Sequence, residues 1–203
     1  MAHGAQGAVM QPPLYAEPGA GVYNEKLGMW VFLGSEVMFF TALIGSYIIL
    51  RVANPGAWAP LSERVLNVPV TAVNTFLLIC SSVTMVKAFA AAQLGRQQML
   101  CRWLVATVLI GATFVGIQVV EYRELIHKGF VPSAGLFPSA FYTMTGFHGF
   151  HVTMGVLCMM YVTWKAFRGK YTGADHRGVE VIGLYWHFVD LVWIILFTIV
   201  YLI

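Results

Sequence analysis

Five long stretches of this chain carry almost no charge, and this pattern restricts the fold more than any other feature. They cover residues 27–50, 68–90, 103–122, 138–164 and 181–203. A helix that crosses a membrane needs about 20 mostly apolar residues, and each stretch is long enough. The composition agrees, since 59% of the residues are hydrophobic and 10% are charged, whereas soluble domains have about 25% charged residues. We therefore predict an all-α polytopic membrane bundle of five transmembrane helices.

The rest of the chain leaves little room for a second domain. Residues 1–24 are rich in Gly, Pro and Ala and lack a basic segment followed by an apolar core, so we expect a flexible cytoplasmic tail rather than a signal peptide. Residues 25–203 then form one transmembrane domain. The three cysteines show no CxxC spacing and are expected to be small apolar residues. The net charge of +3 follows from basic loops between the spans and gives no reason to expect nucleic-acid binding.

The distribution of basic residues predicts how the bundle is oriented in the membrane. Cytoplasmic loops collect Lys and Arg. The side with the N-terminus and the second and fourth loops has eight basic residues, and the other side has four. The eight are Lys26, Lys87, Arg96, Arg102, Lys165, Arg168, Lys170 and Arg177. We therefore predict a cytoplasmic N-terminus and an external C-terminus.

Five ionisable residues lie well inside the predicted spans. Glu36 is in the first span, His148 and His151 are in the fourth, and His187 and Asp190 are in the fifth. At about 1.5 Å per residue they fall near the membrane midplane, with His187 one turn closer to the cytoplasm. An ionisable side chain at this depth marks function or faces protein, so we predict a functional polar cluster. Three more polar residues are expected to form interhelical hydrogen bonds: Asn74, Gln118 and Glu121.

The residue types alone leave three interpretations of the histidines open. A cytochrome b-type anchor would hold a haem between His187 and one of the other two, but a second haem would need a fourth histidine. A metal ion would bind a carboxylate with His148 and His151, although Phe147 and Phe150 flank the pair. In the third interpretation, histidines and carboxylates bond one another across helix interfaces, at about 0.6 kcal/mol per bond. We favour the third and predict no catalytic and no metal-binding residue.

Five motifs follow one another in the spans with a distinctive order and spacing. They are GSEVMFF at Gly34–Phe40, VNTFLLICSS at Val73–Ser82, EY at Glu121–Tyr122, TGFHGFHVTMG at Thr145–Gly155 and YWHFVDLVWIILF at Tyr185–Phe197. In this order they resemble subunit III of the haem–copper terminal oxidases. The resemblance covers residues 25–203 and implies the five-helix bacterial short form, which lacks the first two helices of the seven-helix form.

The resemblance implies a function that is exercised through partners. The family belongs to proton-translocating oxidoreductase complexes of aerobic respiration, which oxidise cytochrome c or quinol, in the bacterial cytoplasmic (inner) membrane. Subunit III has no redox centre of its own, and the haems and copper are expected on partner subunits. It is expected to pack mainly on subunit I, beside subunits II and IV, to bind phospholipid, and to support proton uptake and oxygen access. The alternative within the family is a subunit-III-like partner of a nitric oxide reductase.

The resemblance also assigns family roles to the polar residues in the spans. Glu36 corresponds to the family's intramembrane carboxylate, and His148 and His151 correspond to its paired histidines. His187 and Asp190 belong to its WHFVD motif. On this basis the histidines are expected to bind other side chains rather than a metal.

Overall fold

Helices account for all the regular structure that the computed structural model describes, which comprises residues 23–58, 66–171 and 175–202. The long helices are α1 (Asn24–Ala53), α3 (Val68–Gln93), α4 (Gln97–His127), α5 (Leu136–Phe167) and α6 (Arg177–Phe197). A π-helical turn, η3 (Thr198–Leu202), continues α6, and the connections contain the short 3-10 turns η1 (Pro55–Ala57) and η2 (Pro132–Ala134). These residues contain no strand, so the predicted all-α class is confirmed for the described part of the chain.

The helices extend beyond the apolar stretches that predicted them. The span predicted at 103–122, for example, lies inside α4, which runs from Gln97 to His127. The prediction followed apolar side chains, whereas the backbone hydrogen bonds of a helix continue through flanking polar residues. The predicted tail lies outside the described residues apart from Tyr23 and Asn24, and Asn24 is already the first residue of α1. Ile203, the end of the last predicted span, also lies outside them.

Four of the five long helices are both long enough and apolar enough to cross a membrane. They are α1, α3, α4 and α6 with its η3 extension. α5 is the longest of the five at 32 residues. His148, His151 and four threonines lower its mean hydropathy, so length and composition alone do not identify it as a span.

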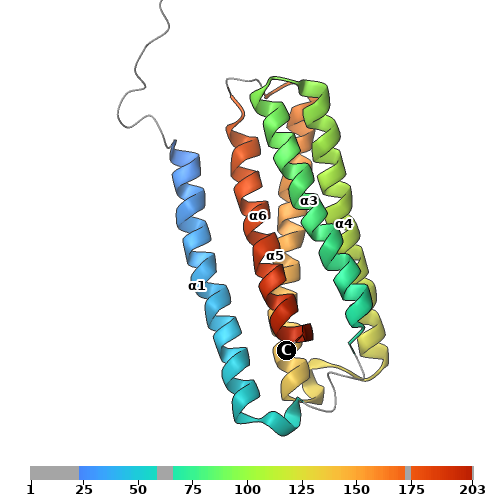
Figure 1. Ribbon diagram of the computed structural model, residues 1–203. Coiled ribbons are helices and arrows are strands. Elements are labelled where there is room, and N and C mark those ends of the chain that lie inside the picture. Colours follow the sequence, from blue (N-terminus) through green and yellow to red (C-terminus); the bar gives the residue numbers. More distant parts are fainter. Residues whose placement is uncertain (1–22, 59–65, 172–174, 203) are drawn as a thin grey trace, which may run out of the picture.

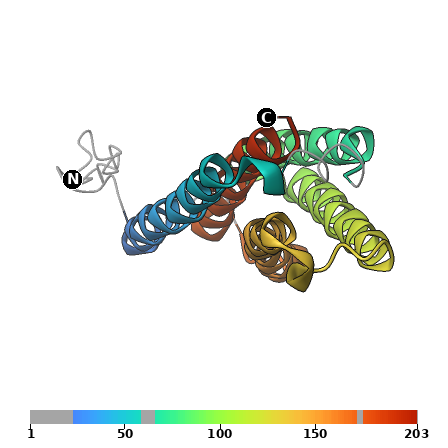
Figure 2. The ribbon, with the colours of Figure 1, turned by 90° about the horizontal axis from the view of Figure 1, so that it is seen from below.

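Four of the helices form a closed ring, and α1 lies outside it. In the ring α3 packs on α4, α4 on α5, α5 on α6 and α6 on α3. α1 contacts α6 and, to a smaller extent, α5, and it stands at the edge of the bundle in Figure 1. Seen down the helix axes in Figure 2, α1, α6 and α3 form a row, and α4 and α5 lie on one side of this row. The ring therefore has an interior, whereas α1 has only one packed face.

Two tryptophans of α6 fill the ring and tie it to α3. Trp186 and Trp193 are 1% and 2% exposed. Their indole nitrogens donate hydrogen bonds of 2.9 Å to Ser81 Oγ and Thr75 Oγ1. A Cβ atom at Gly111 would lie 2.7 Å from the Trp186 ring, so this ring occupies space that only a glycine on α4 leaves free. Small residues of this kind let membrane helices approach closely.

The helices alternate in direction, so the start of α1, the α3–α4 turn and the α5–α6 connection share one end of the bundle (Figure 1). We call it the basic end, because the eight basic residues predicted to be cytoplasmic lie at or near it. The α3–α4 turn is tight. Gly95 has φ +64° and donates to the Ala92 carbonyl at 3.0 Å, which ends α3 and lets α4 begin two residues later.

Candidate functional site: polar groups inside the bundle

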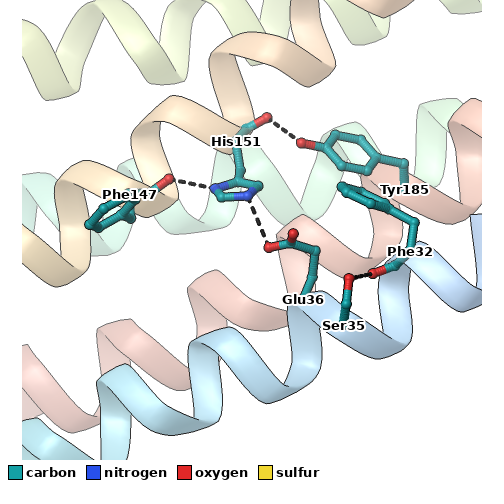
Figure 3. A network of polar contacts seen from close by, with 6 residues as sticks. All are labelled: Phe32, Ser35, Glu36, Phe147, His151 and Tyr185. Carbon is teal, nitrogen blue, oxygen red and sulfur yellow. Dashed lines mark hydrogen bonds and ion pairs between the residues drawn. The ribbon is translucent and has the colours of Figure 1, made fainter.

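Glu36 of α1 and His151 of α5 meet where these two helices pack (Figure 3). Glu36 Oε2 lies 3.0 Å from His151 Nε2, and the two side chains are 16% and 12% exposed. The contact has the distance of an ion pair but not the alignment of a hydrogen bond. His151 Nδ1 lies 2.7 Å from the Phe147 carbonyl oxygen, and because a carbonyl only accepts, Nδ1 carries a hydrogen. Both ring nitrogens of His151 therefore have partners inside the chain.

Aromatic rings surround this pair and fix its position. Tyr185 of α6 donates a hydrogen bond of 2.9 Å to the His151 carbonyl, and Phe32 of α1 stacks on the Tyr185 ring with centroids 6.2 Å apart (Figure 3). The Phe40 ring lies edge-on to His151 at 5.2 Å. Ser35, next to Glu36, donates to the Phe32 carbonyl at 2.6 Å and takes no part in the pair. The pair thus joins α1 to α5 within an apolar frame that α6 helps to build.

His148 lies only three residues before His151 but in a different environment. It is 0% exposed, and neither ring nitrogen has a hydrogen-bond partner in the part of the chain that the structure describes. It stacks on Trp193 at 4.8 Å, and Phe114 and Phe40 lie edge-on at 6.3 and 6.4 Å. Two residues three apart point about 60° apart around a helix. This rotation turns His148 into the ring and His151 towards α1.

A third polar group joins α6 to α3 through a serine. Ser82 Oγ donates to Asp190 Oδ2, and His187 Nδ1 lies 3.1 Å from the same Ser82 oxygen. A hydroxyl has one hydrogen to donate, and with an ionised Asp190 as its acceptor, His187 donates from Nδ1 to Ser82. Asp190 is 6% exposed, whereas His187 is only partly buried. Ser82 was not among the predicted site residues, because helical serines usually bond to their own backbone and give no sign of a cross-helix contact.

The five residues predicted as one polar cluster therefore lie in three groups. Glu36 contacts His151, His187 joins Asp190 through Ser82, and His148 stands alone among aromatic rings. Within residues 23–58, 66–171 and 175–202, no hydrogen bond or ion pair connects one group with another. The α5 histidines face the ring interior and α1, and the polar residues of α6 face α3, although α5 and α6 are neighbours.

The three residues expected to bond between helices each do so, all within the ring. The bonds run from Asn74 Nδ2 to the Phe114 carbonyl at 3.3 Å, from Gln118 Nε2 to the Thr145 carbonyl at 3.1 Å, and from Thr71 Oγ1 to Glu121 Oε1 at 3.0 Å. The first and third join α3 to α4, and the second joins α4 to α5. In hydrocarbon such groups must find partners inside the protein.

The start of α1 is held at the basic end by a second polar contact. Tyr23 OH donates to Glu180 Oε2 at 2.8 Å, and Lys26 Nζ lies 2.6 Å from Glu180 Oε1. Burial, followed by the neighbouring Glu180 carboxylate, raises the pKa of the Tyr23 hydroxyl above its usual value. The hydroxyl therefore keeps its proton and remains a donor. At the far end of α1, Arg51 Nη1 lies 3.4 Å from the Ile199 carbonyl of η3.

These groups offer little to a metal or a haem. Among the described residues, no three or more His, Cys, Asp or Glu side chains gather closely enough to hold a metal ion. The carboxylates bind serine, threonine or tyrosine hydroxyls, lysine or histidine, and two of the three membrane histidines are enclosed or fully paired. The arrangement favours fixing helices to one another.

Comparison with known proteins identifies the family. Residues 20–203 match the family model of cytochrome c oxidase subunit III. The chain is 36% identical over 179 residues to cytochrome c oxidase subunit 3 of Bacillus sp. (strain PS3), covering 88% of this chain and 86% of the relative. It is 40% identical over 178 residues to the probable cytochrome c oxidase subunit 3 of Mycobacterium leprae, covering 88% and 87%.

A third relative carries the name of a different oxidase. It is cytochrome bo(3) ubiquinol oxidase subunit 3 of Pseudomonas aeruginosa, 34% identical over 179 residues, with 88% of this chain and 85% of the relative covered. Relatives of both kinds match nearly the same share of the chain, and the family that the five motifs predicted is confirmed. The chain belongs to the cytochrome c oxidase subunit III family, which makes it a subunit of a haem–copper oxidase complex with other oxidase subunits as its partners.

Proposed function

We propose that this chain is a non-catalytic subunit of a respiratory terminal oxidase and that its partners carry the haems and copper. The way its membrane histidines are used supports this most directly. His151 engages both nitrogens, at Glu36 and at the Phe147 carbonyl, and aromatic rings enclose His148. Of the three, only His187 combines partial exposure with a ring nitrogen that has no partner among the described residues. A bis-histidine haem, as in a cytochrome b-type anchor, takes one imidazole from each side of the ring, and a single available imidazole does not provide both.

We include α5 as the fifth span. It lies between α4 and α6 in the ring, runs antiparallel to both and is at least as long as either. Both neighbours are apolar enough to cross a membrane, so a helix packed along them crosses with them. The polar residues of α5 are compatible with lipid, because His148 and Thr145 are buried, His151 is paired, and the exposed Thr143 hydroxyl donates to the Ser139 carbonyl of its own helix.

We place the basic end in the cytoplasm and the C-terminus outside, in a bacterial inner membrane. The basic end gathers eight of the twelve Lys and Arg residues of the chain, and cytoplasmic ends of membrane proteins have this excess. Trp164 and Arg168 stack at this end with the guanidinium 3.9 Å from the ring centroid. Such aromatic and basic pairs suit the boundary between hydrocarbon and water.

We further propose subunit I as the main contact, with subunits II and IV in the same complex and phospholipid between the helices. The surface of α1 supports a neighbour of this kind, since apolar side chains are exposed along its whole length: Leu27, Val31, Met38, Ile49 and Val52. In the membrane such side chains face either lipid or other apolar helices. The chain would thus cover the flank of subunit I, exclude water from it, and support proton uptake and oxygen access.

The proposal is tested with the purified oxidase before and after this subunit is removed. We expect the depleted enzyme to keep its haem and copper spectrum and to start near its normal rate, because the redox centres lie elsewhere. It should then lose activity during turnover, and adding the subunit back should restore sustained activity. Oxygen consumption over time, recorded with optical spectra, measures this. Loss of the haem and copper spectrum on removal would contradict the proposal, and so would turnover as durable as that of the intact enzyme.

A further inference from the structure

His187 differs from the other two membrane histidines in what its ring still offers. His148 is fully buried and has no hydrogen-bond partner in the described ranges, and His151 has a partner at each nitrogen. His187 is partly exposed, and only its Nδ1 is engaged, by Ser82 at 3.1 Å. Its Nε2 therefore has no hydrogen-bond partner among the described residues. A polar nitrogen of this kind on an outer surface points to something beyond the chain.

The bonds around Ser82 determine what kind of group Nε2 accepts. Ser82 gives its single hydroxyl hydrogen to Asp190, so it accepts the Nδ1 hydrogen of His187. In a neutral imidazole with the hydrogen on Nδ1, Nε2 is a bare acceptor. The matching group on a neighbour is a hydrogen-bond donor, such as a hydroxyl, an indole or an amide N–H.

The surroundings of His187 are those of a membrane interior. His187 lies about 15 Å along α6 from its start, which is near the middle of a hydrocarbon layer about 30 Å thick. We name its surroundings the α3–α6 face, formed by the outward residues of the seam between the two helices: Ile79, Ser82 and Val86 of α3, with His187 and Leu191 of α6. Ile79, Val86 and Leu191 are 40%, 55% and 57% exposed. Lipid tails next to them have no donor for Nε2.

The opposite side of the ring is different. Its strongly exposed residues near the middle of their helices include Leu109 of α4 and Phe150 of α5, at 62% and 61% exposed. The exposed Thr113 hydroxyl donates to the Leu109 carbonyl of its own helix at 2.8 Å, so it needs no outside partner. Lipid tails can cover this side without leaving one of these polar groups unpaired. On the α3–α6 face, lipid tails would leave His187 Nε2 without a hydrogen-bond donor.

We infer that the α3–α6 face receives a transmembrane helix of another oxidase subunit, which donates a hydrogen bond to His187 Nε2. The inference rests on the proposed function, because it takes the neighbour from the same complex. It adds which face of the ring is covered and the chemistry of the covering side chain. Ser82 and Asp190 act as positioning residues, since they hold the imidazole with its accepting nitrogen outward.

Site-specific cross-linking in the intact oxidase tests which face is covered. The photoreactive residue benzoylphenylalanine is placed at Val86 or Leu191 on the α3–α6 face, and at Leu109 or Phe150 as controls of similar exposure. These outward positions tolerate a large side chain. We expect cross-links to another oxidase subunit from Val86 and Leu191, and to lipid alone from the controls. The inference is overturned if Val86 and Leu191 reach only lipid or a second copy of this chain, or if the controls reach a subunit.

The hydrogen bond is tested by comparing His187→Phe with His187→Gln. Phenylalanine keeps a ring without an acceptor, whereas glutamine keeps an acceptor oxygen. A membrane hydrogen bond of about 0.6–1.7 kcal/mol corresponds to a change of about 3- to 20-fold. We expect His187→Phe to leave the complex faster by that factor on dilution in detergent, and His187→Gln to recover part of the loss. Equal rates for wild type and both variants would overturn the hydrogen bond.

A failure of the inference can be told apart from a failure of the proposed function. A wild-type chain that does not purify with a haem–copper complex contradicts the proposed function itself. A chain that does so, but cross-links from the α4 and α5 controls instead, leaves that function intact and moves the docking face.

Discussion

The ring of α3–α6 and the outer helix α1 are built from similar apolar sequences but are held in place differently. The ring closes around large aromatic side chains, of which Trp186 and Phe114 are 1% and 0% exposed. α1 has only two buried residues, Phe40 and Tyr47. It is attached by polar contacts at three levels: Glu180 at the basic end, His151 in the middle and the Ile199 carbonyl of η3 at the far end.

The difference shows what can bind one helix to another inside a membrane. Lipid tails are as apolar as leucine, so replacing lipid by another apolar helix gives little free energy of association. The ring overcomes this by close fit, with Trp186 packed against Gly111 and Gly155. α1 has fewer close contacts, so its placement depends on side chains that lipid cannot satisfy. Disturbing the fit should therefore damage the ring, and removing polar groups should release α1.

The largest effect is expected from adding one methyl group inside the ring. In Gly111→Ala the new Cβ would lie 2.7 Å from the Trp186 ring and 3.0 Å from Val156, so the ring must open. We expect the free energy of unfolding to fall by about 1–3 kcal/mol, as for other overpacked cores. Unfolding of the purified subunit in mixed detergent micelles measures the change.

Gly116, on the same helix, provides the control. A Cβ there meets nothing within 4 Å, and alanine is the better helix former by about 1 kcal/mol. Gly116→Ala should thus be neutral or stabilising. Equal losses from the two variants would mean that the effect belongs to the α4 backbone, not to close packing of the ring.

The five helices could be predicted from the sequence, but their neighbours could not. Apolar runs place each helix because the membrane fixes their length, and η3 simply continues the last run as a π-helix. Nothing in those runs separates α1 from the ring helices. In a soluble protein the polar face of a helix marks the outside, whereas here lipid and protein interior are equally apolar. The family motifs identify the family, but they do not state which side chains meet.

The polar groups show the same limit at the level of single residues. Glu36 and the two α5 histidines were expected near one depth, because depth follows from counting residues, and Glu36 and His151 do lie in contact. Their pairing depends on rotation about the helix axes, which separates His148 from His151. Ser82 was missed because a hydroxyl in an apolar run is commonplace until its position opposite Asp190 is known.

A medium effect is expected from the contact that joins α1 to α5. A double-mutant cycle with Glu36→Leu and His151→Leu isolates the coupling energy of the pair. We expect a coupling energy of about 0.6–1.7 kcal/mol, the range of cross-helix polar contacts in membranes.

Unfolding in detergent supplies the four free energies of the cycle, and a disulfide engineered between α1 and α5 can report whether α1 has moved. Glu36 with His148 serves as the control pair and should show no coupling, since no hydrogen bond or ion pair joins them in the described structure. A coupling of zero for the first pair would mean that α1 is held by apolar contact after all.

The smallest effect, and one of opposite sign, is expected at the histidine inside the ring. Two terms compete in His148→Leu. Losing the stack on Trp193, at 4.8 Å, costs about 0.5–1.5 kcal/mol. Removing a buried polar group that has no hydrogen-bond partner in the described part of the chain recovers about 1–3 kcal/mol. The second term is larger, so the variant should be as stable as wild type or up to about 1.5 kcal/mol more stable. His151→Leu, three residues away, should be less stable because it strips Glu36 of its partner. The measurement is the free energy of unfolding of both variants, compared with wild type. If His148→Leu lost more than about 2 kcal/mol, this imidazole would need a hydrogen-bond partner. The ring would then depend on polar contacts, as α1 does.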